Sequence, residues 1–374
     1  MLFRSRKGFL TATADFSQLA GCDCIYICVP TPFTPNKDPD ISFIEEASRS
    51  VLRSLKQGQI VILKSTTFPG TTENHVQPIL EQGGMKAGSD FYLAFSPERI
   101  DPGNKTWNTK NTPIIVGGIN EVSTGLACRI TKMAIDIVIP VSTPSIAEME
   151  KLLENIFRSV NIALVNELAQ LCDRLGINIW EVIEAASTKP FGFMPFYPGP
   201  GIGGHCILID PYYLEWKARE YDFVTKFIKL AAEINEDMPF YVSSMTIKEI
   251  AKQPITLDNA KVLLLGMAFK RDVADLRHSP ALKVAEILIH EGIRHIAYYD
   301  PYIPEIKIDR KVYESLPKLD SDTLAAFDVV VITTDHSVFD FNMIAGSSKV
   351  VIDTRNALRD SKGGKNIVLL GDGK

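Results

Sequence analysis

Two stretches of the chain alternate short apolar runs with amphipathic ones, and this alternation constrains the fold more than any other feature. In residues 1–140 the strand-like runs are Cys24–Val29, Ile60–Lys64, Phe91–Phe95 and Pro113–Val116. From residue 251 the pattern returns as Lys261–Gly266, His295–Tyr299, Asp328–Thr333 and Val350–Asp353. Strands that alternate with helices favour a parallel, doubly wound sheet. The sequence therefore predicts two α/β domains at the two ends of the chain.

The middle of the chain, residues 141–250, is mostly helical in pattern. Ser145-x-x-Glu148 predicts a capping box, and apolar residues then recur at helical spacing until Gly176 ends the pattern. One long central helix is expected here. The 374 residues suffice for several cores, because a single core rarely grows beyond about 250 residues. We predict three domains: Rossmann-like parallel sheets in residues 1–140 and 251–374, joined by a helical domain in residues 141–250.

Charge and hydropathy exclude two classes of partner. The formal net charge of -5 leaves no excess of cations for a nucleic-acid surface. No apolar run approaches the roughly 20 residues that span a bilayer, and the basic start is followed by too short an apolar stretch for a signal peptide. We expect a cytoplasmic protein that binds neither nucleic acid nor membrane.

The six cysteines divide into three groups. Cys22, Cys24 and Cys28 are all at even-numbered positions, so on a strand their side chains would point to the same face. A buried strand face is favoured over a metal site, because zinc sites prefer Cys-x-x-Cys spacing on loops. Cys128 and Cys172 fall in helix-like patterns and are predicted to lie in the core. Cys206 stands apart, because it follows a glycine-rich loop in which packing gives it no obvious role. No metal is expected.

That glycine-rich segment, 199–204, matches G-x-G-x-x-G but lacks the context of a dinucleotide fingerprint. The fingerprint needs a strand before it and a helix after it, and neither Met194–Pro198 nor Cys206–Pro211 is typical of those elements. Closely spaced glycines still allow a backbone to approach a ligand. A substrate-binding loop is the functional interpretation, and a plain connector is the alternative.

Two groups of polar residues near this loop and in the central helix are candidates for chemistry. The Cys206 thiol, beside His205 and flexible backbone amides, is a candidate nucleophile. Asp210 is either a base or a turn former before proline. Lys151 and Asn155 lie four residues apart, hence on one helix face, and form either part of a site or a solvated polar face.

Polar residues also follow several predicted strands, where doubly wound sheets bind ligands. Val29-Pro30-Thr31-Pro32, Lys64-Ser65-Thr66-Thr67 and Ser96-Pro97-Glu98-Arg99 occupy such ends in the first block. In the last block the segment 270–277 follows a strand and carries Lys270, Arg271 and Arg277. These cations are candidates for pyrophosphate contacts, through bidentate pairing in the case of Arg277.

Seven motifs, in this order, resemble those of the UDP-glucose/GDP-mannose dehydrogenase family over nearly the whole chain from about Thr13. Besides the three strand-end motifs, the second of which continues to Thr72, they are Lys151-Leu152-Leu153-Glu154-Asn155, Gly203-Gly204-His205-Cys206, Gly266-Met267-Ala268-Phe269-Lys270 and Asp353-Thr354-Arg355-Asn356. The resemblance implies oxidation of a sugar C6 alcohol to a carboxylate by two NAD molecules, without release of the aldehyde. It also favours an active-site role for Lys151 and Asn155 over the alternative of a solvated polar face.

The resemblance implies roles for individual residues. Lys151, Asn155 and Asp210 would hold a water molecule or the C6 oxygen and assist its deprotonation. Cys206 would trap the aldehyde as a thiohemiacetal, because hydride loss requires a tetrahedral donor, and oxidation would give a thioester. Glu98, with Thr66 positioning water, would assist hydrolysis. The implied cofactor contacts are Val29, Pro30, Thr31, Ser65, Thr66 and Arg277. The implied substrate contacts are Glu98, Arg99, Lys151, Asn155, Tyr197, Gly199, Gly201, Gly203, Lys270 and Arg355.

The sequence around Cys206 resembles the branch of the family that acts on UDP-N-acetylglucosamine or UDP-N-acetylmannosamine, since UDP-glucose enzymes usually carry Ser at the position of His205. Such an enzyme would supply a surface polysaccharide, and the wide apolar stripe of the central helix predicts a homodimer. Two alternatives stay open: a dehydrogenase for UDP-glucose or GDP-mannose, and a truncated, non-catalytic relative.

Three departures from the family pattern bear on these expectations. The family begins with a strand and a glycine-rich turn that holds the NAD pyrophosphate, and nothing of the kind precedes Asp23. Met1 is expected to fall after that turn, which would leave the N-terminal sheet incomplete and part of its apolar surface open. Leu208 also stands where related enzymes usually have Pro, and Pro102 stands where some have a cofactor-facing Glu.

Overall fold

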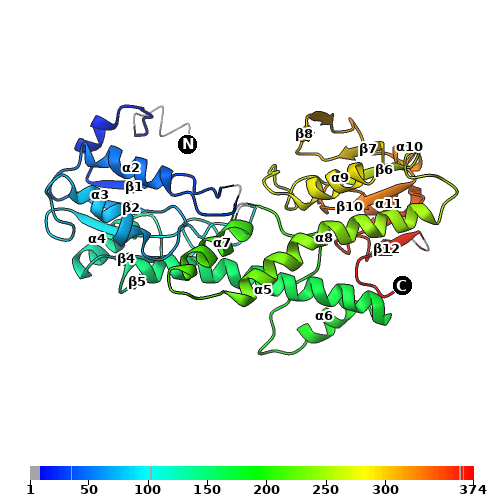
Figure 1. The fold of residues 1–374 in the computed structure, drawn as a ribbon, viewed down its shortest axis with the longest axis horizontal. Coiled ribbons are helices and arrows are strands. Elements are labelled where there is room, and N and C mark those ends of the chain that lie inside the picture. Colours follow the sequence, from blue (N-terminus) through cyan, green and yellow to red (C-terminus); the bar gives the residue numbers. More distant parts are fainter. Residues whose placement is uncertain (1–8, 35, 102, 205, 362–363, 365) are drawn as a thin grey trace. The chain divides into compact units, whose positions relative to one another are not determined.

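The chain divides into two compact units, each with one five-stranded sheet (Figure 1). The computed structural model describes residues 9–34, 36–101, 103–204, 206–361, 364 and 366–374. The first unit comprises Met1–Glu154 and Tyr212–Phe223, and the second comprises Asn155–Pro211 and Val224–Lys374. The predicted α/β class, with two sheets and a long central helix, is confirmed. The three predicted domain boundaries stay a prediction.

The first sheet has the strand order β1-β2-β3-β4-β5. Its strands are β1 (Cys24–Ile27), β2 (Ile60–Leu63), β3 (Tyr92–Phe95), β4 (Ile114–Gly118) and β5 (Val138–Val141). All neighbours are parallel except β3 and β4, which are antiparallel, so the expectation of an entirely parallel sheet is wrong at this pair. Parallel neighbours need a crossover connection, usually helical, and residues 96–113 contain no helix among those described.

Helices cover both faces of this sheet, because its central strands are apolar on both sides. Val61 and Leu63 of β2 pack with α2 (Ser42–Leu52), η2 (Thr72–Val76) and α3 (Gln77–Glu81). Ile60 and Ile62 of the same strand pack with α4 (Glu121–Thr131) on the other face. A short helix, η1 (Phe16–Gly21), precedes β1. Packing on both faces therefore keeps the sheet, and the ends of its strands, rigid.

The second sheet is parallel throughout, with the order β12-β11-β10-β6-β7. Its strands are β6 (Lys261–Leu265), β7 (His295–Tyr299), β10 (Val329–Ile332), β11 (Val351–Asp353) and β12 (Ile367–Leu369). One face packs against α8 (Lys226–Ala251) and α9 (Pro280–His290), and the other against α10 (Ser321–Ala325) and α11 (Phe341–Ser347). An antiparallel hairpin, β8 (Glu305–Ile308) and β9 (Lys311–Glu314), completes the strands of the described chain.

The central helix α5 runs over Pro144–Leu175 and ends at Gly176, whose φ of 70° suits glycine. This confirms the predicted long helix. The predicted capping box is wrong. The Thr143 hydroxyl accepts the Ile146 N–H, Ser145 donates to Glu73, and Glu148 hydrogen-bonds to Gly70 and Thr72. A sequence pattern cannot show that a distant loop competes for the same side chains.

Helix α6 (Ile179–Ser187) and helix α7 (Cys206–Arg219) follow. The expectation that no helix follows the glycine-rich loop is wrong, because α7 begins at Cys206 itself. Pro211 lies within α7, where its ring removes one backbone hydrogen bond without ending the helix. Asp210 is thus helical and does not form a turn. No strand precedes the loop among the described residues from 176 to 204.

The cysteines differ in part from expectation. Strand β1 ends at Ile27, so Cys22 and Cys28 lie outside it and are exposed, and the predicted buried strand face is wrong. Cys128 and Cys172 are buried, as predicted. Among the residues that the structure describes, no helix has the length and apolarity needed to cross a membrane.

Candidate functional site

Three loops of the first unit follow adjacent strands β1, β2 and β3. The Ser65 hydroxyl accepts the Val29 N–H and donates to the Val29 carbonyl, both at 2.8 Å. Lys64 lies 3.7 Å from the Glu98 carboxylate. Because β1, β2 and β3 are parallel neighbours, these ends share one edge of the sheet, the edge at which open α/β sheets bind ligands. The structure thus brings together the three strand-end motifs.

This edge holds a buried hydroxyl group that is not satisfied. Ser96, directly after β3, is 1% exposed, and its Oγ has no hydrogen-bond partner among the described residues. Thr31, after β1, is also buried. Buried polar groups in proteins are rarely left unpaired, so an orphaned hydroxyl at a ligand-binding edge is consistent with a group supplied by a ligand.

The loop that carries Thr66 is held in place by hydrogen bonds to Glu148 of α5. The Glu148 carboxylate accepts hydrogen bonds from the Gly70 N–H at 2.6 Å, the Thr72 N–H at 2.9 Å and the Thr72 hydroxyl at 2.7 Å. It is fully buried, and this burial raises its pKa to about 7 although the hydrogen bonds oppose the rise. Thr66 itself is partly exposed on this anchored loop.

A second link joins α5 to the loop after β3. The Arg99 guanidinium pairs with Glu154, lies 3.5 Å from Glu150 and donates to the Pro113 carbonyl at 2.8 Å. Burial and the neighbouring Glu154 raise the pKa of Glu150 to about 7. Arg99 therefore has protein partners, and its predicted substrate contact stays a prediction. Glu98, next to it, is exposed.

Lys151 and Asn155 lie one turn apart on α5, and both are buried, at 8% and 5% exposure. The alternative of a solvated polar face is therefore wrong. Asn155 donates to the buried carboxylate of Asp210 on α7 at 2.5 Å, so two of the predicted catalytic residues are in contact. No hydrogen bond or ion pair of the Lys151 ammonium is found within the described part of the chain. A buried cation of this kind needs a partner.

The glycine-rich loop of the second unit packs too tightly for side chains. A Cβ at Gly203 would lie 2.6 Å from the Phe269 Cβ, and one at Gly204 would lie 2.9 Å from the Phe269 ring. Gly201, with φ of 128°, faces Pro280. At the start of the loop, the Gly199 N–H donates to the buried Asn166 side chain at 3.0 Å. Gly203 and Gly204 are thus required by close packing.

Arg355, after β11, lies against this loop. Its Nη1 is 2.7 Å from where a Gly199 Cβ would lie, and its Nε donates to the Thr333 carbonyl at 3.0 Å. Burial lowers the pKa of the guanidinium, and the Asp335 and Asp353 charges oppose this effect. Within the described residues, its two Nη groups have no hydrogen bond and no carboxylate within 4 Å.

Arg355 lines a polar cavity of about 650 Å³ at the carboxyl ends of β10 and β11, together with Arg271 and Arg359. Arg271 pairs with Asp335, and Arg359 pairs with Asp360 at 3.2 Å. The cavity therefore presents three guanidinium groups, and in the described residues Arg355 is the one of the three with no carboxylate partner. Such a cavity suits an anion with several oxygen atoms.

The remaining predicted residues are distributed as follows. Arg277 forms a bidentate pair with Asp275, and Tyr197 stacks on Trp180 with ring centroids 5.9 Å apart. Lys270 follows β6 on the loop that also carries Arg271. The side chains of Cys206 and Leu208, and all of His205 and Pro102, lie outside the described residues. For Cys206 the structure gives the backbone position, the first residue of α7.

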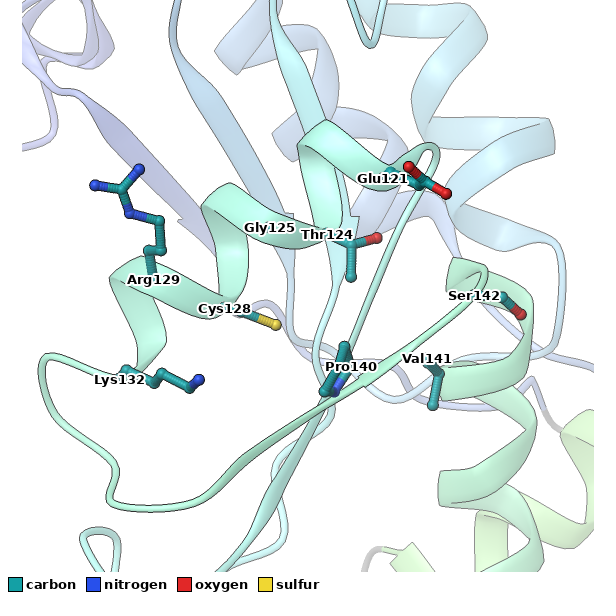
Figure 2. Close-up of a pocket in the computed structure, with 9 residues that line it drawn as sticks. All are labelled: Glu121, Thr124, Gly125, Cys128, Arg129, Lys132, Pro140, Val141 and Ser142. Atoms are coloured by element: carbon teal, nitrogen blue, oxygen red, sulfur yellow. The ribbon is translucent and has the colours of Figure 1, made fainter.

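A second cavity, of about 640 Å³, lies in the first unit between α4 and β5 (Figure 2). Figure 2 shows Lys132 reaching toward β5, whereas Arg129 points away from it. None of the residues predicted from the sequence for catalysis, cofactor or substrate lines this cavity. Nothing in it suggests a role in the chemistry.

Comparisons with known proteins agree with these features. Three models of the UDP-glucose/GDP-mannose dehydrogenase family match the chain: the NAD binding domain over residues 1–135, the central domain over 145–237 and the UDP binding domain over 263–360. The UDP-N-acetyl-D-mannosamine dehydrogenase of Pyrococcus horikoshii is 37% identical over 94% of this chain and 82% of its own length. The chain belongs to the UDP-glucose/GDP-mannose dehydrogenase family.

Other relatives of the family agree with this assignment. The UDP-N-acetyl-D-glucosamine 6-dehydrogenase of Pseudomonas aeruginosa is 34% identical over 94% of this chain and 83% of its own length. The solved structure of the UDP-D-ManNAc dehydrogenase from Pyrococcus horikoshii has a TM-score of 0.88, with 34% identity, and covers 99% of this chain and 86% of that one. The predicted family, enzyme class and NAD cofactor are confirmed. The chain is a nucleotide-sugar dehydrogenase.

Sequence reasoning missed several residues that organise the site. The amides of Asn166 and Asn235 hydrogen-bond to each other at 2.9 Å and hold the start of the glycine-rich loop. Asp300 and His336, both buried, contact each other beside the loop after β6. A polar residue directly after a strand was the available signal for Asp300, but nothing in the sequence pairs it with His336, 36 residues away.

Proposed function

We propose that this chain oxidises the C6 hydroxyl of a UDP-N-acetylhexosamine to the carboxylate, using two molecules of NAD, to supply a surface polysaccharide. The observation that carries the proposal is the Arg355 guanidinium beside Gly199, whose Nη groups lack partners among the described residues. Its cavity has room for a diphosphate and lies in the segment that matches the UDP binding domain. Relatives named for UDP-N-acetylmannosamine and UDP-N-acetylglucosamine support this choice of sugar.

The chain's own residues supply the groups for alcohol oxidation. Asp210, held by Asn155, would accept the proton of the C6 hydroxyl, and the Lys151 ammonium would stabilise the oxygen as its charge grows. Both Asn155 and Asp210 are buried, so water would not compete for the same hydrogen bonds. Glu98 and Thr66, which follow β3 and β2, would orient the water that hydrolyses the thioester.

Cys206 would act as the covalent nucleophile. Its thiolate would attack the aldehyde carbon, the carbonyl oxygen would take a proton, and the resulting thiohemiacetal would lose a second hydride to give a thioester. Water would then release the carboxylate and return the thiol. The first residue of a helix is a position at which unpaired backbone N–H groups favour a thiolate.

NAD, when bound, supplies the two-electron hydride acceptor. The residues that would hold it are Val29, Pro30, Thr31, Ser65 and Thr66, at the sheet edge where the orphaned Ser96 hydroxyl is buried. The fit rests on that hydroxyl and on the rigid pairing of the Val29 and Ser65 loops. Arg277 stays a further candidate for the cofactor.

We also propose a homodimer formed through α5. Apolar side chains spaced three, four or, in one place, seven residues apart remain at least 37% exposed along the helix: Ile146, Met149, Leu153, Phe157, Leu164, Leu168, Leu171 and Leu175. An exposed stripe of this length on one helix is unusual for a monomer and typical of a helix that packs against a partner. The cytoplasmic location predicted from the sequence stays a prediction.

The test is NADH formation by the purified chain with UDP-N-acetylglucosamine, UDP-N-acetylmannosamine, UDP-glucose and GDP-mannose as donors. We expect turnover with one of the two N-acetylhexosamines and none above background in Cys206→Ser. Turnover of UDP-glucose or GDP-mannose alone would refute the substrate, and normal turnover of Cys206→Ser would remove Cys206 from the mechanism. Binding of UDP without turnover of any donor would favour a non-catalytic relative.

A further inference from the structure

The loop after β6, which carries Lys270 and Arg271, is tied to two neighbouring loops by a buried histidine and aspartate. His336 follows β10 and is 0% exposed, and Asp300 follows β7 and is 3% exposed. His336 Nε2 lies 3.1 Å from Asp300 Oδ2. Neither residue belongs to the groups proposed above for catalysis or binding.

The Asp300 carboxylate is saturated with donors. Its Oδ2 accepts the N–H groups of Met267 at 2.6 Å and Ala268 at 2.9 Å, and its Oδ1 accepts those of Tyr302 at 2.8 Å and Ile303 at 3.1 Å. Although burial opposes the change, these bonds and the one from histidine lower the pKa of Asp300 from its ordinary value. An ionised Asp300 needs a donor at His336 Nε2.

The hydrogen bond at the other ring nitrogen of His336 determines which tautomer the ring adopts. Nδ1 lies 3.0 Å from the Asp272 backbone N–H and accepts it, so Nδ1 carries no proton. The ring is therefore neutral, with its single proton on Nε2. The Asp272 side chain in turn accepts the Ser337 N–H at 2.9 Å. The rings of Tyr302 and Phe339 enclose the imidazole, with centroids 5.0 and 5.4 Å away.

These contacts hold the loop at both of its ends, at Met267 and Ala268 through Asp300 and at Asp272 through His336. Between the two anchors lie Phe269, against which the glycine-rich loop packs, and the two cations. Arg271 is paired with Asp335, the residue before His336, and lines the 650 Å³ cavity.

We propose that the His336–Asp300 pair is a positioning device that sets Lys270 and Arg271 for the phosphates of the UDP group. The assignment rests on the proposed function, because it needs that group in the cavity. The imidazole does not touch the ligand. It acts through the backbone of the loop, and a misplaced loop weakens the binding of the nucleotide while the chemical step at the distant C6 atom keeps its rate.

The test uses two replacements that each keep one hydrogen bond, with UDP as the probe in calorimetry. His336→Asn keeps an acceptor near the Nδ1 position, and His336→Gln keeps a donor near Nε2. We expect His336→Asn, which loses the hydrogen bond to the charged Asp300, to weaken UDP binding about tenfold. His336→Gln, which loses the neutral bond from the Asp272 N–H, should weaken UDP binding by a smaller factor. Both should raise KM with little change in kcat. The exposed His290, whose ring lies 3.3 Å from Asp309 in the same domain, is the matched control, and His290→Asn should bind UDP like the wild type.

Two further measurements separate positioning from general stability. In an Arg271→Ala background, His336→Asn should weaken UDP binding by less than tenfold, because one of the two cations through which it acts is gone. Nitrogen NMR of the folded wild type should show the His336 ring neutral, with its proton on Nε2. Fully additive losses, wild-type affinity in both folded variants, or a proton on Nδ1 would overturn the proposal. Failure of the wild type to bind UDP would instead overturn the proposed function, and this assignment with it.

Discussion

Gly199→Ala should weaken nucleotide binding without unfolding the chain. The new Cβ would lie 2.7 Å from Arg355 Nη1 and 3.2 Å from its Cζ, whereas ordinary contact begins at 3.4 Å. The guanidinium must therefore move by about 0.7 Å, the difference between 2.7 and 3.4 Å. Because Nε, 3.7 Å away, is already at ordinary contact distance, the shift turns the Nη end of the guanidinium away from the position that it holds beside the 3.0 Å bond to the Thr333 carbonyl.

The expected loss follows from what Arg355 would do for a phosphate. A hydrogen bond to a charged group contributes about 1.5–3 kcal/mol, so losing its alignment should weaken UDP binding roughly 10- to 100-fold. Gly199 has no positive φ, so alanine fits the backbone, and the clash is with the end of a flexible side chain. The melting temperature should therefore stay close to that of the wild type.

The assay is calorimetric titration with UDP beside a thermal melt of each variant. Gly125→Ala is the control, because its Cβ on α4 would meet no atom within 4 Å. It should bind UDP normally and melt no lower than the wild type. Wild-type affinity in folded Gly199→Ala would refute the role given to Arg355.

Three other predictions concern packing, pH and assembly. Gly203→Ala should lower the melting temperature, by the equivalent of about 1–3 kcal/mol, because its Cβ would meet the Phe269 Cβ, the His278 carbonyl and Pro280 within 2.6–2.9 Å. Glu148→Gln should gain stability relative to the wild type as pH rises. Burial raises the Glu148 pKa from 4.5 to about 7, so the wild type loses up to about 3 kcal/mol of stability as pH rises between those values. Thermal melts of both proteins from pH 5 to 8 measure the difference. Leu164→Arg on α5 should halve the mass found by light scattering, because it places a charge in the proposed dimer contact.

The outcomes that would contradict these predictions are distinct. An unchanged melting temperature for Gly203→Ala would mean that the loop has more room than its contacts indicate. Parallel pH profiles for Glu148→Gln and the wild type would show that Glu148 does not titrate in that window. Val122→Arg, an equally exposed apolar-to-cation change on α4, is the control for Leu164→Arg. A dimer that survives Leu164→Arg would remove α5 as the contact.

Local periodicity was enough to predict most of the fold. The apolar runs gave eight strands, and the spacing up to Gly176 gave the length of α5. Strand β5 was missed because it is a short edge strand, with Ile139 and Pro140 exposed and no alternation to detect. The start of α7 was missed because an Asp before Pro211 is typical of a turn, whereas here Pro211 lies in the second turn of the helix.

The site was predictable as far as each residue belongs to a local motif. The spacing of Lys151 and Asn155 placed them on one face of α5, but only the packing shows that this face is buried. The role of Glu148 as an anchor was not predictable, because its partners are 76 and 78 residues away. The same holds for His336 and Asp300. Tertiary hydrogen bonds of this kind have no period that a single sequence can display.

The central helix has a consequence for anyone who engineers this protein. On α5 the buried Lys151 and Asn155 alternate with exposed Leu153 and Phe157, so one stretch of two helical turns carries both surfaces. Changes made to raise solubility by replacing exposed leucines would fall within a residue or two of the buried polar pair. A soluble variant of this kind with poor turnover would therefore not be evidence of damage to the fold elsewhere.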